Sequence, residues 1–279
     1  MEYNKEELNI GQLLLKSGKL TSKDCTLILN EQKANGMRFG DIAVNKGLVK
    51  QKDIDEVISK QFEFSYLVND ENKIDPKVQT AYAPSSLIGE KIRTLRNQLE
   101  NRWLGNQKSF VLSGVESNIG NSLLCANLAV SFAQLGKNTL LVDSDLRRAK
   151  VHSLFGMQNN RGFSDLLASR AEIADVIHKT PISNLSIITA GTEAPNPVEL
   201  LGKSSALSVI KHIEQDYDVV IYDSVNINEF SDSHILTHKV GGVVLVVKRN
   251  STTTKLFESV KKQFDISNCT IIGSVINDY

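Results

Sequence analysis

Six short and almost uninterrupted aliphatic runs are spaced along the C-terminal two thirds of the chain. They occupy residues 109–113, 139–143, 185–190, 218–223, 242–247 and 270–276, and stretches of helical pattern such as 122–136 and 196–215 lie between them. Continuous apolar runs, unlike alternating ones, are typical of strands that are buried on both faces. Strands that alternate with helices predict an α/β fold with a doubly wound parallel sheet.

The first 68 residues follow a different pattern, which repeats. Residues 9–32 align with residues 38–61 at a shift of 29 positions. The matched pairs include Gly11 with Gly40, Gly18 with Gly47, and Gln32 with Gln61. Each copy has the pattern of a short helix ended by glycine, an apolar residue, a capping residue and a second helix. We therefore predict a small, mainly helical tandem-repeat domain at residues 1–68.

This repeat resembles the cyclic-di-GMP-binding N-terminal domain of type II secretion and pilus assembly ATPases. The second copy follows that pattern from Arg38 to Gln61, whereas the first copy has Asn9 where the pattern has an arginine. Asparagine offers a shorter, neutral contact in place of a bidentate fork. The resemblance implies a cyclic-di-GMP site formed by Asn9, Gly11, Gly18, Gln32, Arg38, Gly40, Gly47 and Gln61. A helix pair that only docks a protein partner is the alternative.

The segment that joins the two parts is polar. Residues 69–86 contain Pro76 and Pro84, a composition typical of a linker, so the C-terminal domain is expected to span 87–279. That domain opens with a helical stretch, 87–104, in which Glu90, Arg93 and Arg96 share one face. Such a face is ordinarily solvated charge. The spacing E-x-x-R-x-x-R also resembles the ring-forming oligomerisation motif of bacterial tyrosine kinases, which implies a homo-oligomer contact.

The charge balance narrows the range of partners. The chain carries 32 Lys and Arg against 32 Asp and Glu, so no net field attracts it to nucleic acid. No apolar run approaches the roughly 20 residues that cross a bilayer, and the first residues lack a signal-peptide core, so we expect a cytoplasmic protein without a transmembrane segment. The three cysteines suit a reducing compartment, and no metal-ligand spacing is present among cysteines and histidines.

Polar residues follow three of the predicted strands. Asp143 and Asp145 come at the end of the second strand, and Asp223 ends the run 218–223. The segment after the first strand has the position of a phosphate-binding loop, with Gly114, Ser117, Asn118, Gly120, Asn121, Ser122 and Leu123 as candidate nucleotide ligands. Ligands of such sheets bind beyond the carboxyl ends of the strands. A single aspartate there is more often a turn former, but three beside this loop indicate a magnesium–nucleotide site.

The segments SLLCANLAVSFAQLGKNTLLVDSDLRR, NPVELL and YDVVIYDS resemble the P-loop tyrosine autokinases that control exopolysaccharide chain length, which are related to cell-division and partition ATPases. The resemblance, together with the repeat domain, covers nearly the whole chain. It implies that Ser122 binds Mg²⁺, that Asp143 and Asp145 hold Mg²⁺ and accept the tyrosine proton, and that Asp223 completes the metal shell.

The loop departs from the P-loop (Walker A) template at several positions. Asn121 stands where the template has its lysine, and Val115 stands where it has its first glycine. Ile119 is β-branched and is expected to resist the left-handed backbone of phosphate-binding loops. The chain also has a lone Tyr279 in place of the family's tyrosine-rich tail, and Ser-Val-Asn after Asp223 in place of Thr-Pro-Pro. We therefore expect weak ATP binding or none.

Three hypotheses follow. The first is a pseudokinase-like regulatory protein of exopolysaccharide biosynthesis or export, peripheral at the inner membrane through a polysaccharide co-polymerase and sensitive to cyclic-di-GMP. The second is an active tyrosine autokinase in which another cation, such as Lys108, Arg147 or Arg148, or one from a neighbouring subunit, replaces the missing lysine. The third is a positioning ATPase of the partition type, which is disfavoured because the loop lacks that family's signature lysine.

Overall fold

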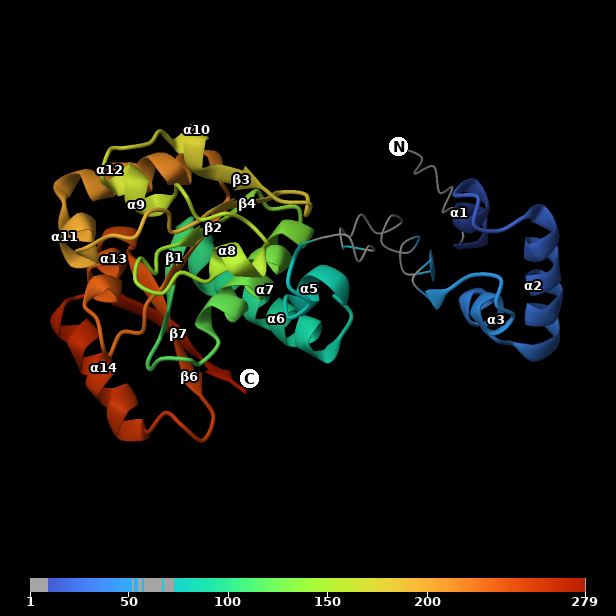
Figure 1. Ribbon diagram of the computed structural model, residues 1–279. Helices are drawn as coiled ribbons and strands as arrows, with labels where there is room; N and C mark the ends of the chain where they lie inside the picture. The colour runs from blue at the N-terminus through green and yellow to red at the C-terminus, as the bar shows by residue number, and fades with distance from the viewer. Residues whose placement is uncertain (1–9, 52, 55–56, 58–66, 68–72, 279) are drawn as a thin grey trace, which may run out of the picture. The chain divides into compact units, whose positions relative to one another are not determined.

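The computed structural model describes residues 10–51, 53, 54, 57, 67 and 73–278 (Figure 1). Contacts divide the chain into two compact units, residues 1–70 and 71–279. Asn9 and Gln61 of the candidate cyclic-di-GMP site, and Tyr279, lie outside the described residues. Within the described ranges, no helix has both the length and the apolar character needed to cross a membrane.

The larger unit is built on a seven-stranded sheet with the order β3-β4-β2-β5-β1-β6-β7. The strands are β1 (Ser109–Gly114), β2 (Thr139–Asp143), β3 (Ile177–Lys179), β4 (Leu185–Ile188), β5 (Val219–Ser224), β6 (Gly242–Lys248) and β7 (Thr270–Asn277). All six predicted strands are present and parallel. The edge strand β3, which runs antiparallel to β4, was not predicted because its three residues include only one apolar side chain.

Helices cover both faces of the sheet, which confirms the doubly wound arrangement (Figure 1). On one face α7 (Asn121–Gln134) packs against β1, β2 and β5, and α5 (Gln79–Tyr82), α6 (Leu87–Leu99) and α8 (Val151–Leu154) pack against α7. On the other face one hydrophobic core joins the strands to α9 (Phe163–Leu167), α10 (Ile173–Val176), α11 (Pro197–Gly202), α12 (Ser204–Ile213), α13 (Asp232–Val240) and α14 (Thr254–Ile266).

Two predicted helices are interrupted. The stretch 196–215 is divided at Lys203, whose ψ of 144° is extended, into α11 and α12, followed by a 3₁₀ turn η2 (Glu214–Asp216). The stretch 87–104 consists of α6 and a π-helical turn, η1 (Glu100–Leu104), which ends at Gly105. The first interruption directly follows Gly202, a residue that favours the end of a helix.

The prediction of a linker at 69–86 is wrong for its described part, residues 73–86. Ile74, Val78 and Ala81 are buried, with 3%, 0% and 0% exposure. The amide of Thr80 donates to Oδ1 of Asn127 in α7 at 3.0 Å, and the Thr80 hydroxyl bonds the same side chain at 2.8 Å. Residues 73–82, which we call the strap, therefore belong to the larger unit and are fixed against α7.

The smaller unit contains α1 (Ile10–Lys16), α2 (Ser22–Asn35) and α3 (Phe39–Asn45). Its two copies fold alike where they are described. Gly18 and Gly47 both have positive φ, 70° and 66°, in the turns after α1 and α3. The amide of Leu20 bonds the carbonyl of Leu14, and the amide of Val49 bonds that of Ala43, 29 residues later in each case. The repeat in sequence is thus a repeat in backbone geometry.

Candidate functional site

The predicted phosphate loop connects β1 to α7. Asn118 and Gly120 have left-handed backbones, with φ of 58° and 79°, and Gly120 is the N-cap of α7. Asparagine is the residue that, after glycine, most readily adopts this conformation. Ile119 lies between them with ordinary negative φ and is 2% exposed. The expectation that Ile119 would disturb the loop is therefore wrong, because the left-handed positions fall on its neighbours.

Gly114 and Val115 have structural roles in this loop. A Cβ atom at Gly114 would lie 2.8 Å from Cδ1 of Ile119 and 2.9 Å from the carbonyl oxygen of Glu116, so only glycine fits there. Val115 is fully buried, and its amide donates to the carbonyl of Val246 in β6. The loop thus reaches a packed, ordered form in spite of its departures from the template.

A cavity of about 400 Å³ opens at the carboxyl end of the sheet beside this loop. All the predicted loop residues line it, namely Gly114, Ser117, Asn118, Gly120, Asn121, Ser122 and Leu123, together with Asp145. Lys77, Arg148 and Lys150 line it from other segments. Asp143 and Asp223 lie outside this lining and are buried, with 0% and 1% exposure.

Asn121 is turned toward the strand ends. Its Nδ2 donates to Oδ1 of Asp223 at 2.7 Å, to the carbonyl of Leu112 at 3.0 Å and to that of Ser224 at 3.2 Å. A neutral amide held in this way replaces the positive charge that a P-loop lysine presents to the outer phosphates. Asn121 therefore joins β1 to β5 but supplies no cation to the cavity.

The two buried aspartates face each other, and neither forms a salt bridge with a residue that the structure describes. Asp143 and Asp223 are neighbours in the register of β2 and β5. Burial is the first cause that raises the pKa of Asp223, to about 7, whereas its hydrogen bond from Ser122 acts to lower it. Burial and then the charge of Asp223 raise the pKa of Asp143 well above its usual range. The pair therefore binds protons more readily than ordinary carboxyls.

Backbone amides hold the carboxylate at the end of β2, Asp143, and that of Asp145 in the loop that follows. Oδ2 of Asp143 accepts from the amides of Lys150 and Val151, both at 3.0 Å. Oδ1 of Asp145 accepts from the amides of Arg147 at 3.1 Å and Arg148 at 2.8 Å. Burial raises the pKa of Asp145, and these two amide bonds act against that rise. The loop is therefore folded around the acidic residues.

Three residues of the predicted metal set fit a magnesium ion that is shared with a nucleotide, whereas backbone amides already occupy both carboxylate oxygens of the fourth, Asp143. Oδ2 of Asp223 and Oδ1 of Asn121 are buried oxygens without a hydrogen-bond partner among the described residues. In the same ranges no group of three His, Cys, Asp or Glu side chains converges. Magnesium is usually held by one or two carboxylates plus phosphates and water, which suits Ser122, Asp145 and Asp223. When bound, it would neutralise charge on the phosphate oxygens.

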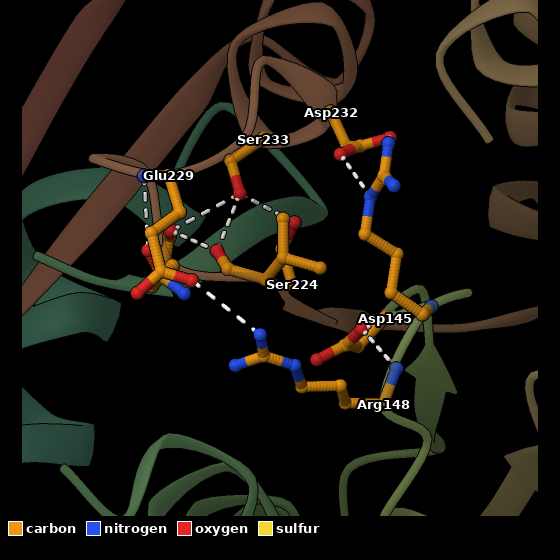
Figure 2. A network of polar contacts seen from close by, with 10 residues as sticks. Asp145, Arg148, Ser224, Glu229, Asp232 and Ser233 are labelled. Carbon is orange, nitrogen blue, oxygen red and sulfur yellow. Dashed lines mark hydrogen bonds and ion pairs between the residues drawn. The ribbon is translucent and has the colours of Figure 1, made fainter. Parts of the chain in front are cut away.

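A polar network joins the loops that follow β2 and β5 (Figure 2). Nε of Arg147 lies 2.9 Å from Oδ2 of Asp232, a carboxylate only 2% exposed, and its guanidinium lies 4.3 Å from the ring centre of Phe230. Arg148 pairs with Glu229 at 3.6 Å. These contacts span about eighty residues of sequence, and no local signal points to them.

The structure argues against the three cations that were considered as replacements for the missing lysine. Lys108 lies just before β1, at the end of the sheet opposite to the cavity, and its Nζ donates to the carbonyls of Glu214 and Gln215. Arg147 and Arg148 are paired with acidic residues in the network above. Within this chain, Lys108 is therefore too far away to replace the missing P-loop lysine. The two arginines are already engaged by acidic residues.

The predicted oligomerisation residues are not equally exposed. Arg96 is 6% exposed, and its Nη1 donates to the carbonyl of Ser131 in α7 at 2.9 Å. Arg93 bonds Glu90 and the carbonyl of Pro84 within the same chain. The interpretation of all three residues as one free face is wrong, because Arg96 contributes to the packing of α6 on α7. A subunit contact at Glu90 and Arg93 stays a prediction.

The candidate cyclic-di-GMP residues that the structure describes are dispersed over the smaller unit. Gly11 and Gly40 lie inside helices, where Cys25 Sγ approaches the Gly11 carbonyl at 3.8 Å and a Cβ atom at Gly40 would lie 3.4 Å from the Ile54 side chain. Gly18 and Gly47 form turns, Gln32 is half-buried and Arg38 is exposed. The left-handed backbone accounts for Gly18 and Gly47 without a ligand, and ligand binding by this set of residues stays a prediction.

Comparison with known proteins adds an independent line of evidence. A family model described as an AAA domain matches residues 116–238. The chain is 31% identical over 195 residues to the putative tyrosine-protein kinase CapB of Staphylococcus aureus. The aligned region covers 70% of this chain and 86% of CapB. The chain is 35% identical to the tyrosine-protein kinase wzc of Salmonella typhi but spans only 27% of that protein.

Solved structures agree with this assignment. The kinase domain of the Escherichia coli tyrosine kinase ETK superimposes with a TM-score of 0.71 at 26% identity, covering 77% of this chain and 85% of that domain. The likeness to CapB extends over most of the length of CapB, and the mostly parallel seven-stranded sheet agrees with it. The chain therefore belongs to the family of bacterial tyrosine-protein kinases.

Proposed function

We propose that this protein is a regulatory member of its kinase family, with an impaired ATP site, that acts in exopolysaccharide biosynthesis or export and helps to set chain length. The observation that carries the proposal is the Asn121 amide, which bonds Asp223 and two carbonyls at the place of the P-loop lysine. The ordered loop and the cavity support weak nucleotide binding, and the missing charge argues against efficient phosphoryl transfer.

The expected size of the defect follows from the lost contact. A charge-assisted hydrogen bond contributes roughly 1.5–3 kcal/mol, which corresponds to about tenfold to hundredfold in affinity. Loss of a preorganised donor to developing charge typically lowers the rate by about a hundredfold to a thousandfold. Phosphoryl transfer depends mainly on positioning and charge stabilisation, so the reaction suffers more than binding.

Titration calorimetry with Mg-ATP tests this proposal. The variant Asn121→Lys restores the ammonium group, and Asn106→Lys adds the same charge at an exposed position far from the loop. We expect Asn121→Lys to bind Mg-ATP about tenfold to hundredfold more tightly than the wild type, and Asn106→Lys to match the wild type. Equal affinity of the wild type and Asn121→Lys would mean that the asparagine is no defect.

We place the protein at the inner membrane through a polysaccharide co-polymerase. The proposal is supported by the likeness to wzc, a tyrosine-protein kinase of which this chain spans 27%. Co-purification with the cytosolic segments of the co-polymerase is the direct test. Retention of this chain on those segments is expected, and a failure to bind any component of the export system would remove the assignment to this pathway.

We further propose that the smaller unit binds cyclic-di-GMP through its second copy. Arg38 supports this proposal because it is exposed at the start of α3 and offers a fork that suits phosphate or a guanine edge. Calorimetry with cyclic-di-GMP should show binding that is weakened in Arg38→Ala. The absence of heat at high micromolar ligand would leave protein docking as the role of this unit.

A further inference from the structure

The cavity beside the phosphate loop is lined by charged side chains of both signs, and Asp75, Glu116 and Asp145 are its acidic residues. Lys77, Arg148 and Lys150 all line it. Arg148 is paired with Glu229 and lies 5.7 Å from the ring centre of Phe230. Lys77 and Lys150 are exposed, and neither forms a salt bridge with the part of the chain that the structure describes. Two ammonium groups are thus available to an anion in the cavity.

The backbone of Lys77 is fixed beside the first turn of α7. Nδ2 of Asn127 donates to the carbonyl of Leu123 at 2.9 Å and to the carbonyl of Lys77 at 3.4 Å. Leu123 itself lines the cavity, directly after the phosphate loop. One buried amide therefore joins the strap to the helix turn whose amides would face a phosphate.

The other end of the same segment is held as well. The amide of Asp75 donates to the carbonyl of Leu154 at 2.8 Å, and the amide of Lys77 donates to Oδ1 of Asp75 at 2.8 Å. Val78, which follows, is fully buried. Because both sides of Lys77 are anchored, a bound anion would have to order only its side chain, which limits the entropic cost of the contact.

Lys150 comes from the loop after β2. Its amide donates to Oδ2 of Asp143 at 3.0 Å, so its backbone position is fixed by the buried carboxylate. The side chain is exposed and lines the cavity. Lys77 and Lys150 therefore reach one cavity from two segments that are 73 residues apart in sequence, both of them outside the phosphate loop.

We propose that Lys77, assisted by Lys150, supplies the positive charge for the triphosphate of a bound nucleotide in place of the lysine that is missing at position 121. The inference rests on the proposed function, because it concerns the same weak nucleotide site. It assigns to the strap, which precedes the α/β sheet, a direct contact with the ligand. The class of ligand is a nucleoside triphosphate with its magnesium ion.

The test is calorimetry of Mg-ATP binding to the full chain at low ionic strength. Lys77→Gln is compared with Lys73→Gln, which removes the same charge from an exposed strap position that does not line the cavity. We expect about tenfold weaker binding for Lys77→Gln, and about a hundredfold for the double variant Lys77→Gln/Lys150→Gln. Lys73→Gln should stay within about twofold, because an exposed charge outside the site is screened. Thermal melting confirms that each variant is folded.

A second comparison uses Asn121→Lys as the background. If Lys77 replaces the missing lysine, Lys77→Gln should lose most of its effect once position 121 carries an ammonium group, a non-additivity that a general electrostatic role would not produce. Equal affinities of Lys77→Gln and Lys73→Gln, or no binding of Mg-ATP by the wild type, would overturn the inference. Either result would leave the regulatory function standing, whereas efficient phosphorylation by the wild type would overturn that function alone.

Discussion

The floor and the rim of the candidate nucleotide cavity differ in charge and in exposure. By the floor we mean Asn121, which lines the cavity, and the carboxylates of Asp223 and Asp143, which are buried behind it outside the lining. The rim consists of Lys77, Arg148 and Lys150, whose side chains are exposed. Charge on the floor acts in a low-dielectric setting, whereas charge on the rim is screened by water.

This difference between floor and rim affects nucleotide binding less than phosphoryl transfer. Cations at the rim can attract and hold an anionic ligand, but a screened and flexible ammonium stabilises developing charge less well than a buried, fixed one. On the floor, burial raises the pKa of Asp223 to about 7. A protein of this kind can sense a nucleotide while turning it over poorly.

The largest expected effect is a pH dependence of the folding stability of the protein, which comes from Asp223 on the floor. A carboxyl whose pKa is raised on folding stabilises the folded state below its unfolded pKa, and this contribution is lost as the pH rises through the folded value. For Asp223 the window runs from 3.8 to about 7. The contribution of Asp223 to the free energy of unfolding therefore has an upper bound on the order of 4 kcal/mol.

Denaturant unfolding without nucleotide or metal, repeated across this window, measures the effect. We expect the free energy of unfolding of the wild type, relative to Asp223→Asn, to fall as the pH rises. Asn121→Lys should show a flatter profile, because an ammonium group beside Asp223 lowers its pKa. Parallel profiles for the wild type and Asp223→Asn would show that Asp223 titrates normally.

The next effect concerns the arginines beside the rim. Arg147→Gln should lower the free energy of unfolding by about 2–3 kcal/mol, because it leaves the 2% exposed carboxylate of Asp232 without its partner. Arg148→Gln is the matched control, and its loss should stay below about 1 kcal/mol, since its partner Glu229 is 40% exposed. Chemical denaturation of both variants compares them, and losses of equal size would contradict this difference between the two pairs.

The smallest effect concerns the strap. Thr80→Val removes the hydroxyl that bonds Asn127 at 2.8 Å and should cost about 1 kcal/mol of stability. Thr26→Val, which removes an exposed hydroxyl in α2, serves as the control and should have almost no effect. Thermal unfolding of the two variants measures the two losses of stability. A Thr80→Val protein as stable as the control would mean that the Thr80 hydroxyl does not contribute to holding the strap.

Much of the fold could be predicted because its signals are local. The aliphatic runs located six strands, and the acidic residues that follow Val142 and Tyr222 were correctly placed at the carboxyl edge of the sheet. The strap was mistaken for a linker because its prolines and polar residues dominate the pattern. The spacing of Ile74, Val78 and Ala81 did carry a sign of burial, since residues four and three apart share one face.

Other features depend on distant contacts. The salt bridge between Arg147 and Asp232 joins residues 85 apart, so no window of sequence contains it. Ile119 was expected to disturb the loop because the left-handed positions cannot be located without the backbone. The same holds for Lys77, which lies 44 positions before Asn121 and reaches the cavity on a strap that Asn127 and Leu154 help to hold.

The most direct test of the central claim is turnover of radiolabelled Mg-ATP by the purified wild type, measured beside CapB under the same conditions. The missing lysine predicts neither phosphotyrosine nor ATP hydrolysis above the blank, a rate at least about a hundredfold below that of the relative. Magnesium-dependent phosphotyrosine formation at a rate comparable with that of CapB would contradict the account.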